Sequence, residues 1–396
     1  MFRMEIVLYF RPSPSSKPEK LSGVRDIAEK VHIHIQVVDE APSKERVRSL
    51  LSFWKCRGVI VECGGRDEII DPQIFGTIPA VFFNQSFETL PKRCFAVCHD
   101  SKHTGNLAAR ELLLSEAEHF TYISAPSNPF WSQERRQGFI EALTLNGKEC
   151  IDFSWPKKVD TATRRTKALQ KFLQDLPKPC AVFAANDALA AEVVTAAKLS
   201  NIAIPGEIAI LGVDNSLDIC EHTIPTLSSI EPDFRRGGNL AMLMLLAVMR
   251  NKGGFEGLRH RTFGDLHVVR RLSTKRFRTS DPIVIQAIDL IRKKACMGLK
   301  AAEVAQIFPC SRRMADLRFT RTVGHSILDE IQSVRLDRAK QLLLNPNQDL
   351  KSISDFCGFE HPNSLRKFFL KETGMTLSRW REKHLNKALP DDLPAI

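Results

Sequence analysis

The last hundred or so residues of the chain contain the same short unit twice. The first copy reads AAEVAQIFPCSRRMADLRFTRTVGHS at 301–326, and the second reads LKSISDFCGFEHPNSLRKFFLKETGMT at 350–376. In each copy we expect a short amphipathic helix, a turn, and a second helix with cationic and polar side chains. This is the helix-turn-helix layout. Two copies joined by a rigid helix can place two recognition helices in successive major grooves of DNA, roughly 34 Å apart.

The distribution of charge supports the same interpretation. The chain of 396 residues carries a formal net charge of +11, and residues 275–396 hold 22 Lys and Arg against 14 Asp and Glu. The carboxy-terminal third therefore carries most of the positive surplus, as a surface that binds phosphate requires. A solvated basic face is the alternative explanation of the same charge.

The first 270 residues alternate between short apolar runs and helical patterns. Because these runs are almost continuously hydrophobic, they indicate strands buried on both faces, as in parallel sheets covered by helices. The segment is long enough for two such sheets, with a ligand cleft at the carboxyl ends of the strands. The strand candidates are 5–10, 32–38, 58–63, 79–83, 119–124, 180–186 and 208–214.

The sequence predicts an α/β two-lobed domain followed by an all-α domain. We place the first at 1–274, a polar basic linker at 275–281, the helical domain at 282–385 and a tail at 386–396. Asp281 and Pro282 supply an N-cap and a first-turn proline for a helix whose apolar face is Ile285, Ile288 and Ile291. The connector at 327–344 carries an apolar stripe that can pack against both repeated units.

Each repeated unit offers candidate DNA contacts. In the second, Ile353, Phe356 and Phe359 are expected to face inward, Gly358 to permit the turn, and Pro362 and Gly374 to bound the recognition helix. Its exposed residues would be His361, Asn363, Ser364, Arg366, Lys367 and Lys371. In the first, Ser311 would cap a helix that presents Arg312, Arg313, Asp316 and Arg318. An ordinary helical bundle with charged faces is the alternative.

Several functional classes find little support in the sequence. The ten scattered cysteines are typical of buried free thiols in a reducing compartment, and the pair Cys94 and Cys98 has no second pair to complete a zinc site. We therefore expect no metal and no cofactor. The amino terminus resembles no secretory signal, and no stretch approaches the ~20 apolar residues of a membrane span, so we expect a cytoplasmic protein.

Two further classes of function compete with DNA-binding regulation. One is an enzyme that modifies or repairs DNA with a reactive cysteine, but no motif near a cysteine would lower its pKa, and no Ser-His-Asp, P-loop or H-E-x-x-H pattern is present. The other is a sugar-binding transport component, which would require a signal peptide. We expect the chain not to be an enzyme.

The segment GFEHPNSLRKFFLKETGMTLSRWR resembles the signature of the AraC/XylS transcription regulators. The similarity covers residues 282 to about 384, and it implies that Asn363, Ser364 and Lys367 read bases. Leu365 and Leu377 depart from the family pattern in the second unit. Ala315 and Leu317 depart from it in the first, where Arg313 would supply the contact that Leu317 cannot.

The front of the chain resembles the effector domain of LacI/GalR-type sugar repressors. The similar segments are ERRQGFIEAL (134–143), FAANDALAAEVV (183–194), IAIPGEIAILGVDN (202–215) and VVRRLST (268–274). The combination resembles the xylose-responsive regulators of the AraC family. That resemblance implies a sugar-responsive, sequence-specific transcription regulator, an activator of pentose utilisation genes by default, which acts as a homodimer and recruits RNA polymerase.

The same resemblance implies a set of ligand-binding residues. It places the ligand-binding arginine at Arg135, the amide at Asn186 and the carboxylate at Asp214. These residue types suit a sugar, because sugar hydroxyls donate to carboxylates and accept from guanidinium and amide groups. Trp131 would offer an apolar face to a sugar ring, or else simply pack in the core. Asp214 and Asp100 have helix capping as the alternative role. Position alone suggests that Arg11, Ser13 and Ser15 line the rim of the cleft.

Overall fold

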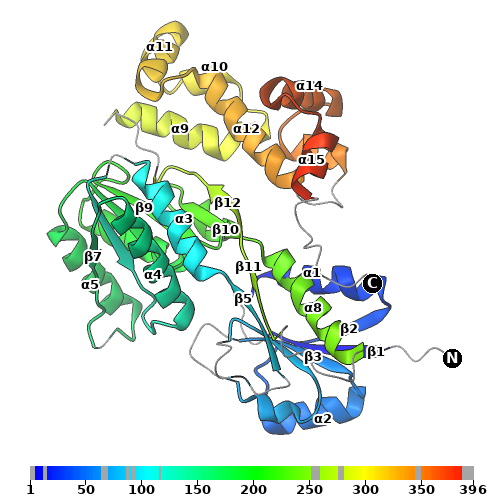
Figure 1. Ribbon diagram of the computed structural model, residues 1–396. Coiled ribbons are helices and arrows are strands. Elements are labelled where there is room, and N and C mark those ends of the chain that lie inside the picture. The colour runs from blue at the N-terminus through cyan, green and yellow to red at the C-terminus, as the bar shows by residue number, and fades with distance from the viewer. Residues whose placement is uncertain are drawn as a thin grey trace. The chain divides into compact units, whose positions relative to one another are not determined.

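The computed structural model describes residues 5–11, 16–63, 70–85, 90, 94–115, 117–157, 159–250, 259–274, 281–343 and 349–385. They form two compact units, Met1–Lys275 and Arg276–Ile396 (Figure 1). The first unit contains two six-stranded sheets covered by helices, and the second is helical. The predicted fold class, a two-lobed α/β domain followed by an all-α domain, is confirmed.

The first sheet is parallel, with strands in the order β11-β5-β4-β3-β1-β2. Helices α1 (Pro18–Lys30) and α8 (Phe234–Arg250) cover one face, while α2 (Lys44–Trp54) and η1 (Pro72–Phe75) cover the other. We call this part lobe 1. Its strands are β1 (Glu5–Phe10), β2 (Ile33–Val38), β3 (Gly58–Glu62), β4 (Ala80–Phe83), β5 (Cys94–His99) and β11 (His260–Phe263).

The second sheet has the order β12-β10-β9-β8-β6-β7, and only its edge strand β12 is antiparallel. We call this part lobe 2. Its strands are β6 (His119–Ile123), β7 (Cys150–Asp152), β8 (Cys180–Ala184), β9 (Ile208–Val213), β10 (Ser228–Pro232) and β12 (Asp265–Val269). Its helices are α3 (Ser101–Leu113), α4 (Phe130–Leu145), α5 (Ala162–Asp175), α6 (Asp187–Leu199) and α7 (Leu217–Cys220).

All seven predicted strands are present, with bounds within two residues of the prediction. Strands β5, β7, β10, β11 and β12 were not predicted. Most of the missed strands carry Ser, Asp, Glu, Pro, His or Arg, so they lack the apolar run that marks a central strand.

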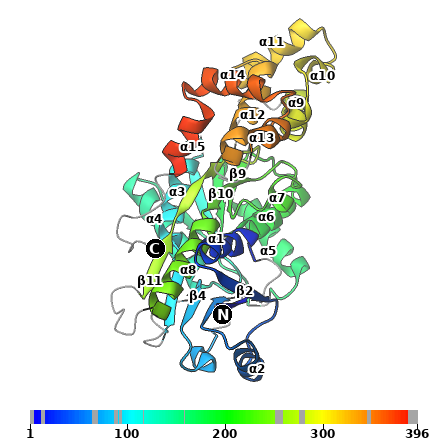
Figure 2. The same ribbon diagram turned by 90° about the vertical axis from the view of Figure 1, so that its right-hand side faces the viewer.

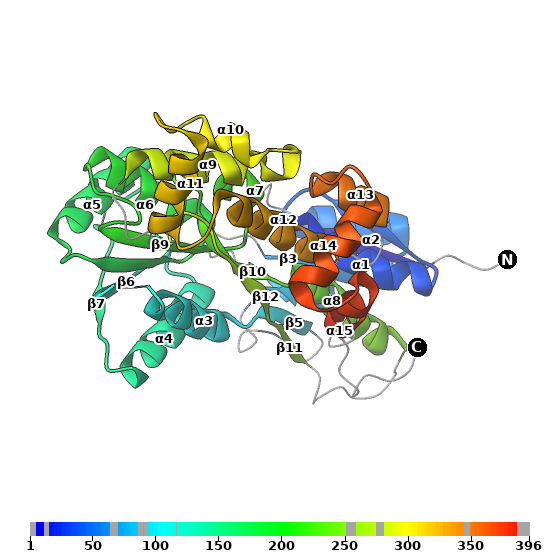
Figure 3. The same ribbon diagram turned by 90° about the horizontal axis from the view of Figure 1, so that it is seen from above.

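Glycines allow the helices of each lobe to cross at close range. In lobe 2, a Cβ on Gly138 would lie 1.9 Å from the Lys102 carbonyl oxygen, and a Cβ on Gly105 would lie 2.1 Å from that of Arg135. In lobe 1, α1 and α8 meet in the same way at Gly23 and Gly238. Figure 3 shows α3 and α4 side by side in lobe 2. This close crossing positions the Arg135 segment against α3.

The second unit contains two helix-turn-helix motifs. Helices α10 (Ala301–Ala305) and α11 (Arg312–Val323) form the first, α13 (Leu350–Phe356) and α14 (Pro362–Thr373) form the second, and α12 (Ile327–Leu343) connects them (Figure 2). Helices α9 (Pro282–Lys294), η4 (Ala295–Met297) and α15 (Leu377–Leu385) complete the unit. Helices α11 and α14 end alike, at Gly324 (φ +90°) and Gly374 (φ +69°), because glycine tolerates left-handed backbone.

Two predicted core positions in this unit are wrong. Phe356 is 56% exposed, and Cys357, fully buried, takes its place, because Cys357 lies four residues after Ile353 and thus on the same helical face. Likewise Ile285 is exposed, whereas Val284 packs inside with Ile288. The predicted N-cap at Asp281 is confirmed: its Oδ1 accepts from the Ile283 backbone N–H at 3.1 Å.

The predicted linker, apart from Asp281, and the predicted tail lie outside the described residues. Among the helices that are described, none has the length and apolar character that crossing a bilayer demands.

Candidate effector site and DNA interface

The guanidinium of Arg135 lies at the carboxyl end of β8. Arg135, on α4, is only 5% exposed, and its Nη1 donates to the backbone oxygen of Ala185. Its Nη2 lies 3.1 Å from Nδ1 of His99, at the end of β5 in lobe 1. The Trp131 ring centroid is 4.8 Å from the Arg135 Cζ atom, so Trp131 stacks over the guanidinium as well as packing on the core of lobe 2.

Asn186 and Asp100 both cap helices. The Oδ1 atom of Asn186 accepts from the Leu189 backbone N–H at 2.9 Å at the start of α6. The Oδ1 atom of Asp100 accepts from the His103 N–H at 3.0 Å at the start of α3. The capping alternative for Asp100 is therefore what the structure shows. Capping occupies the Oδ1 atom in each case, so the Asn186 amide nitrogen and the Asp100 Oδ2 atom have no hydrogen bond within the described residues.

Asp214 directly follows β9 and is not a helix cap. Its backbone lies in the left-handed region (φ +108°), and Ser216 is the N-cap of the next helix, α7. Within the part of the chain that the structure describes, no hydrogen bond or ion pair engages the Asp214 carboxylate. The Arg135 guanidinium contacts Ala185 and His99 and not this carboxylate.

The carboxylate of Asp187 anchors the loop that carries Asp214. This buried carboxylate accepts from the Ser229 hydroxyl at 2.6 Å and, through its other oxygen, from the Ser216 N–H at 2.8 Å. Burial, followed by the negative charge of Asp214, raises the pKa of Asp187 to about 7. The sequence analysis singled out Asn186, one residue earlier, and missed Asp187. A carboxylate at the start of an otherwise apolar helix was the signal that could have identified it.

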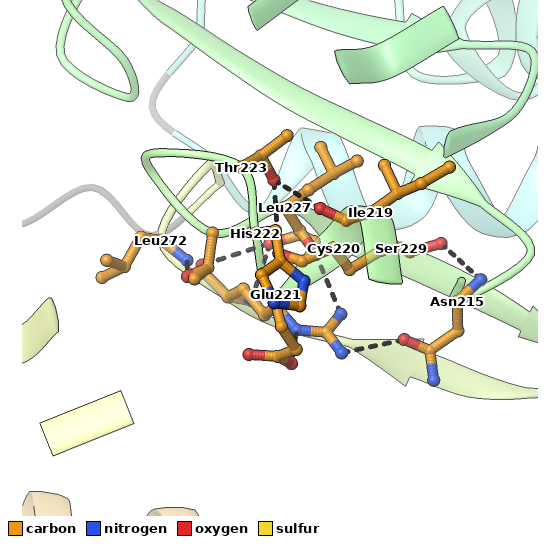
Figure 4. Close-up of polar contacts among 12 residues, drawn as sticks. Asn215, Ile219, Cys220, Glu221, His222, Thr223, Leu227, Ser229 and Leu272 are labelled. Atoms are coloured by element: carbon orange, nitrogen blue, oxygen red, sulfur yellow. Dashed lines mark hydrogen bonds and ion pairs between the residues drawn. The ribbon is translucent and has the colours of Figure 1, made fainter. Parts of the chain in front are cut away.

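The guanidinium of Arg271 also holds this loop. Its Nε donates to Glu221 at 2.6 Å, its Nη2 to the Asn215 side chain at 2.9 Å, and its Nη1 to the Leu227 carbonyl oxygen at 2.9 Å. The three residues that accept these bonds, Asn215, Glu221 and Leu227, are labelled in Figure 4. The loop from Asp214 to Glu221 is thus held by two buried charged groups, Asp187 and Arg271, which leaves the Asp214 carboxylate in a defined place.

Lobe 1 contributes a lysine that the sequence analysis missed. The ammonium of Lys17, just before α1, donates to the Ser216 hydroxyl and lies 3.3 Å from the Asp214 backbone oxygen. Next to it, the buried Glu62 accepts from Tyr9 and from Lys20. Arg11 pairs with Asp39 at 2.8 Å, and Ser13 and Ser15 lie outside the described residues. The position of Lys17 directly after the first βα loop was the signal available.

In the second unit, the first recognition helix presents fewer free side chains than predicted. Ser311 caps α11, as expected, and Arg312 and Arg313 are exposed. Asp316, however, accepts from the Ile327 N–H at 3.0 Å and so holds the start of α12. Arg318 donates to Asp281 at 2.6 Å. Arg312 and Arg313 are therefore the stronger candidates for DNA contact on this helix.

The second recognition helix, α14, exposes every candidate that the sequence indicated. These residues are His361, Asn363, Ser364, Arg366, Lys367 and Lys371. Asn363 accepts a hydrogen bond from Arg366 at 2.7 Å, and Lys371 lies 3.3 Å from Glu372. Both recognition helices line a hollow of about 1070 Å³, with Arg312, Arg313 and Asp316 from α11 and Ser364 from α14.

Six of the ten cysteines are buried, as structural thiols are. Burial raises the pKa of Cys98, Cys180 and Cys357 to about 12, so these thiols are protonated at neutral pH. All ten cysteines are free, and Cys310 is exposed. Within the described ranges, no group of three or more His, Cys, Asp or Glu residues is placed to hold a metal ion.

Comparison with known proteins identifies both units. Residues 109–274 match the periplasmic binding protein-like domain family, and residues 304–383 match a helix-turn-helix domain family. The xylose operon regulatory protein of Haemophilus influenzae is 27% identical over 288 residues, an alignment that covers 70% of this chain and 73% of that protein.

Two solved structures share the fold. The structure of a xylose-binding transcription activator matches with a TM-score of 0.60 and 22% identity, and the match covers 97% of this chain and 99% of that one. A lac repressor dimer bound to operator and an anti-inducer matches with a TM-score of 0.54 and 19% identity, over 69% of this chain and 95% of that one. The related proteins are regulators and not enzymes, which agrees with the sequence-based expectation. This chain is therefore a DNA-binding transcription regulator of the AraC/XylS type, in which a periplasmic binding protein-like effector domain precedes a double helix-turn-helix domain.

Proposed function

We propose that the effector is a small neutral sugar, a pentose such as xylose, and that it binds where the carboxyl ends of β8 and β9 present Asn186 and Asp214. The proposal rests mainly on the Asp214 carboxylate, which is held in place by its loop and has no hydrogen-bond partner in the described structure. Such a carboxylate can accept from adjacent sugar hydroxyls. The names of related regulators favour a pentose.

Arg135 and Trp131 would complete the lobe 2 side of the site, and Asp100 would contribute its free oxygen. A guanidinium and an amide donate to sugar oxygens, and an aromatic ring packs against the apolar face of a pyranose. Lys17 would approach from lobe 1. Together these groups offer both donors and acceptors around an uncharged ligand.

Binding of the sugar would change how the second unit engages promoter DNA. A sugar can do so only by its different affinity for two states of the protein. We place base reading on Asn363, Ser364 and Lys367, with Arg312 and Arg313 at the first recognition helix. Activation of pentose utilisation genes in the cytoplasm, as a homodimer that recruits RNA polymerase, is the regulatory role we propose. The dimeric lac repressor with the same effector fold supports the dimer.

Titration calorimetry with a panel of pentoses and hexoses tests the effector. The decisive variant is Asp214→Asn, because Asn tolerates the left-handed backbone at φ +108° and keeps the shape while removing the charge. We expect at least a tenfold loss of pentose affinity, the size of a lost charged hydrogen bond, and a promoter-binding response that stays at its sugar-free level.

The matched control is Asp218→Asn, which changes an exposed carboxylate in the same loop. It should bind the sugar as the native protein does, and both variants should show the cooperative thermal melt of a folded protein. If folded Asp214→Asn responds to the same sugar at the same concentration, the pocket lies elsewhere.

A further inference from the structure

The segments that join the two lobes meet at a buried polar cluster around His99. One segment leads from β5 through His99 into α3, a second from β11 through Gly264 into β12, and a third from β10 through Asp233 into α8. Backbone hydrogen bonds tie them together: the Asp100 N–H donates to Phe263 at 2.8 Å, and the Asp233 N–H donates to Gly264 at 2.9 Å. Any rotation of one lobe against the other must bend the chain here. Figure 1 shows β11 of lobe 1 running on into β12 of lobe 2.

His99 links two of these segments with its side chain. Its ring stacks on Phe263, with 5.2 Å between ring centroids, and its Nε2 lies 2.7 Å from Oδ1 of Asp265. The other oxygen of Asp265 accepts from the Thr104 hydroxyl at 2.9 Å. The side chains of His99 and Asp265 are 4% and 1% exposed, so water does not compete for these bonds.

The hydrogen-bond partners fix the protonation pattern of His99. The Nη2 atom of Arg135 can only donate, so Nδ1 of His99, 3.1 Å away, must accept. The proton of a neutral imidazole then sits on Nε2 and points at the Asp265 carboxylate. The result is a hydrogen-bonded series of alternating donors and acceptors from Asp265 through His99 to the guanidinium of Arg135.

This hydrogen-bonded series constrains Arg135, an arginine of the candidate effector site. Arg135 is held on one side by the Ala185 carbonyl oxygen of its own lobe and on the other by His99 of lobe 1. Its Nε is buried without a hydrogen-bond partner in the described structure. The direction of the guanidinium therefore depends on where the inter-lobe segments place His99.

We infer that His99 is a positioning residue that sets the orientation of Arg135 toward the effector and links that orientation to the movement of the lobes. The inference rests on the proposed function, because it takes Arg135 to contact the sugar. If the effector binds only when Arg135 points in one direction, its binding favours one arrangement of the inter-lobe segments. Asp265 is the fixed end of the hydrogen-bonded series.

The test is a double-mutant cycle in the full chain with His99→Phe and Arg135→Met, measured for pentose affinity by calorimetry. Phenylalanine keeps the ring that stacks on Phe263 but removes both nitrogens. We expect His99→Phe to weaken pentose binding about 10- to 100-fold, and to have no further effect when Arg135 is already Met. His99→Asn, whose Oδ1 can replace Nδ1 as acceptor, should recover most of the affinity. Replacing the exposed His103 of α3 by Phe serves as the control and should change nothing.

A second readout separates this inference from the proposed function. The same cycle, measured as thermal stability without ligand, reports whether His99 and Arg135 interact at all. Additive losses in stability overturn the inference, as do additive losses in pentose affinity or an affinity that His99→Phe leaves unchanged. If the native protein binds no pentose, the proposed function is wrong, and the ligand-free cycle alone decides whether His99 orients Arg135.

Discussion

Asp187 should make the stability of the effector domain depend on pH in an unusual direction. Burial and the charge of Asp214 raise its pKa from 3.8 to about 7 in the folded protein. Between those two values the folded state keeps a proton that the unfolded state has lost. The free energy of unfolding must therefore fall as pH rises from about 4 to 7. The stabilisation from protonated Asp187 is fully present below the pKa of the unfolded state and is lost as pH rises through the folded pKa.

The size of the effect follows from the shift. At about 1.4 kcal/mol for each unit of pKa, a rise of about three units corresponds to roughly 4 kcal/mol across this pH window. Asp187→Asn removes the titrating group, and its amide can still accept from the Ser216 N–H. Relative to the native protein, the variant should therefore gain up to about 4 kcal/mol of stability between pH 4.5 and pH 7.5.

Urea unfolding at several pH values, followed by tryptophan fluorescence, measures this difference. Trp131 and Trp155 pack on the core of the same lobe and report its unfolding. Asp175→Asn, an exposed acid at the end of α5, is the control and should follow the native pH dependence. A stability difference between Asp187→Asn and the native protein that is the same at every pH would refute the reasoning. Asp214→Asn should move the window to lower pH, because it removes a neighbouring negative charge.

Three other outcomes are expected. Promoter affinity should fall about 1000-fold between 50 and 200 mM salt if some six cationic side chains contact phosphates, and a flat response in filter binding would contradict the DNA interface. Asn363→Ala or Lys367→Ala should cost about 1 to 3 kcal/mol on the operator and little on random DNA, whereas Lys371→Ala should weaken both alike; equal losses on both DNAs for all three would refute the assignment of base readers. Gly138→Ala should destabilise lobe 2 by about 3 kcal/mol or more, because its Cβ would lie 1.9 Å from a backbone oxygen, while Gly264→Ala, with open space around it, should not; equal melting temperatures would contradict the close helix crossing.

Signals confined to neighbouring residues were sufficient for seven of the strands that the structure describes and for the double helix-turn-helix. A buried parallel strand is recognisable as an apolar run, and Asp281, Ser311 and Gly374 act on backbone groups within four residues of themselves. The wrong core prediction at Phe356 is also local. A shift of one residue determines whether Phe356 or Cys357 lies on the same helical face as Ile353.

Only the tertiary structure decided how the site is assembled. His99, Arg135 and Asp265 belong to three separate segments, and Lys17 reaches Ser216 from 199 residues away. Arg318 carries the charge expected of a DNA contact, yet it pairs with Asp281 because α9 passes beside α11. The sequence shows which groups carry charge, but the path of the chain determines which of them meet, because hydrogen bonds and ion pairs act over only a few ångströms.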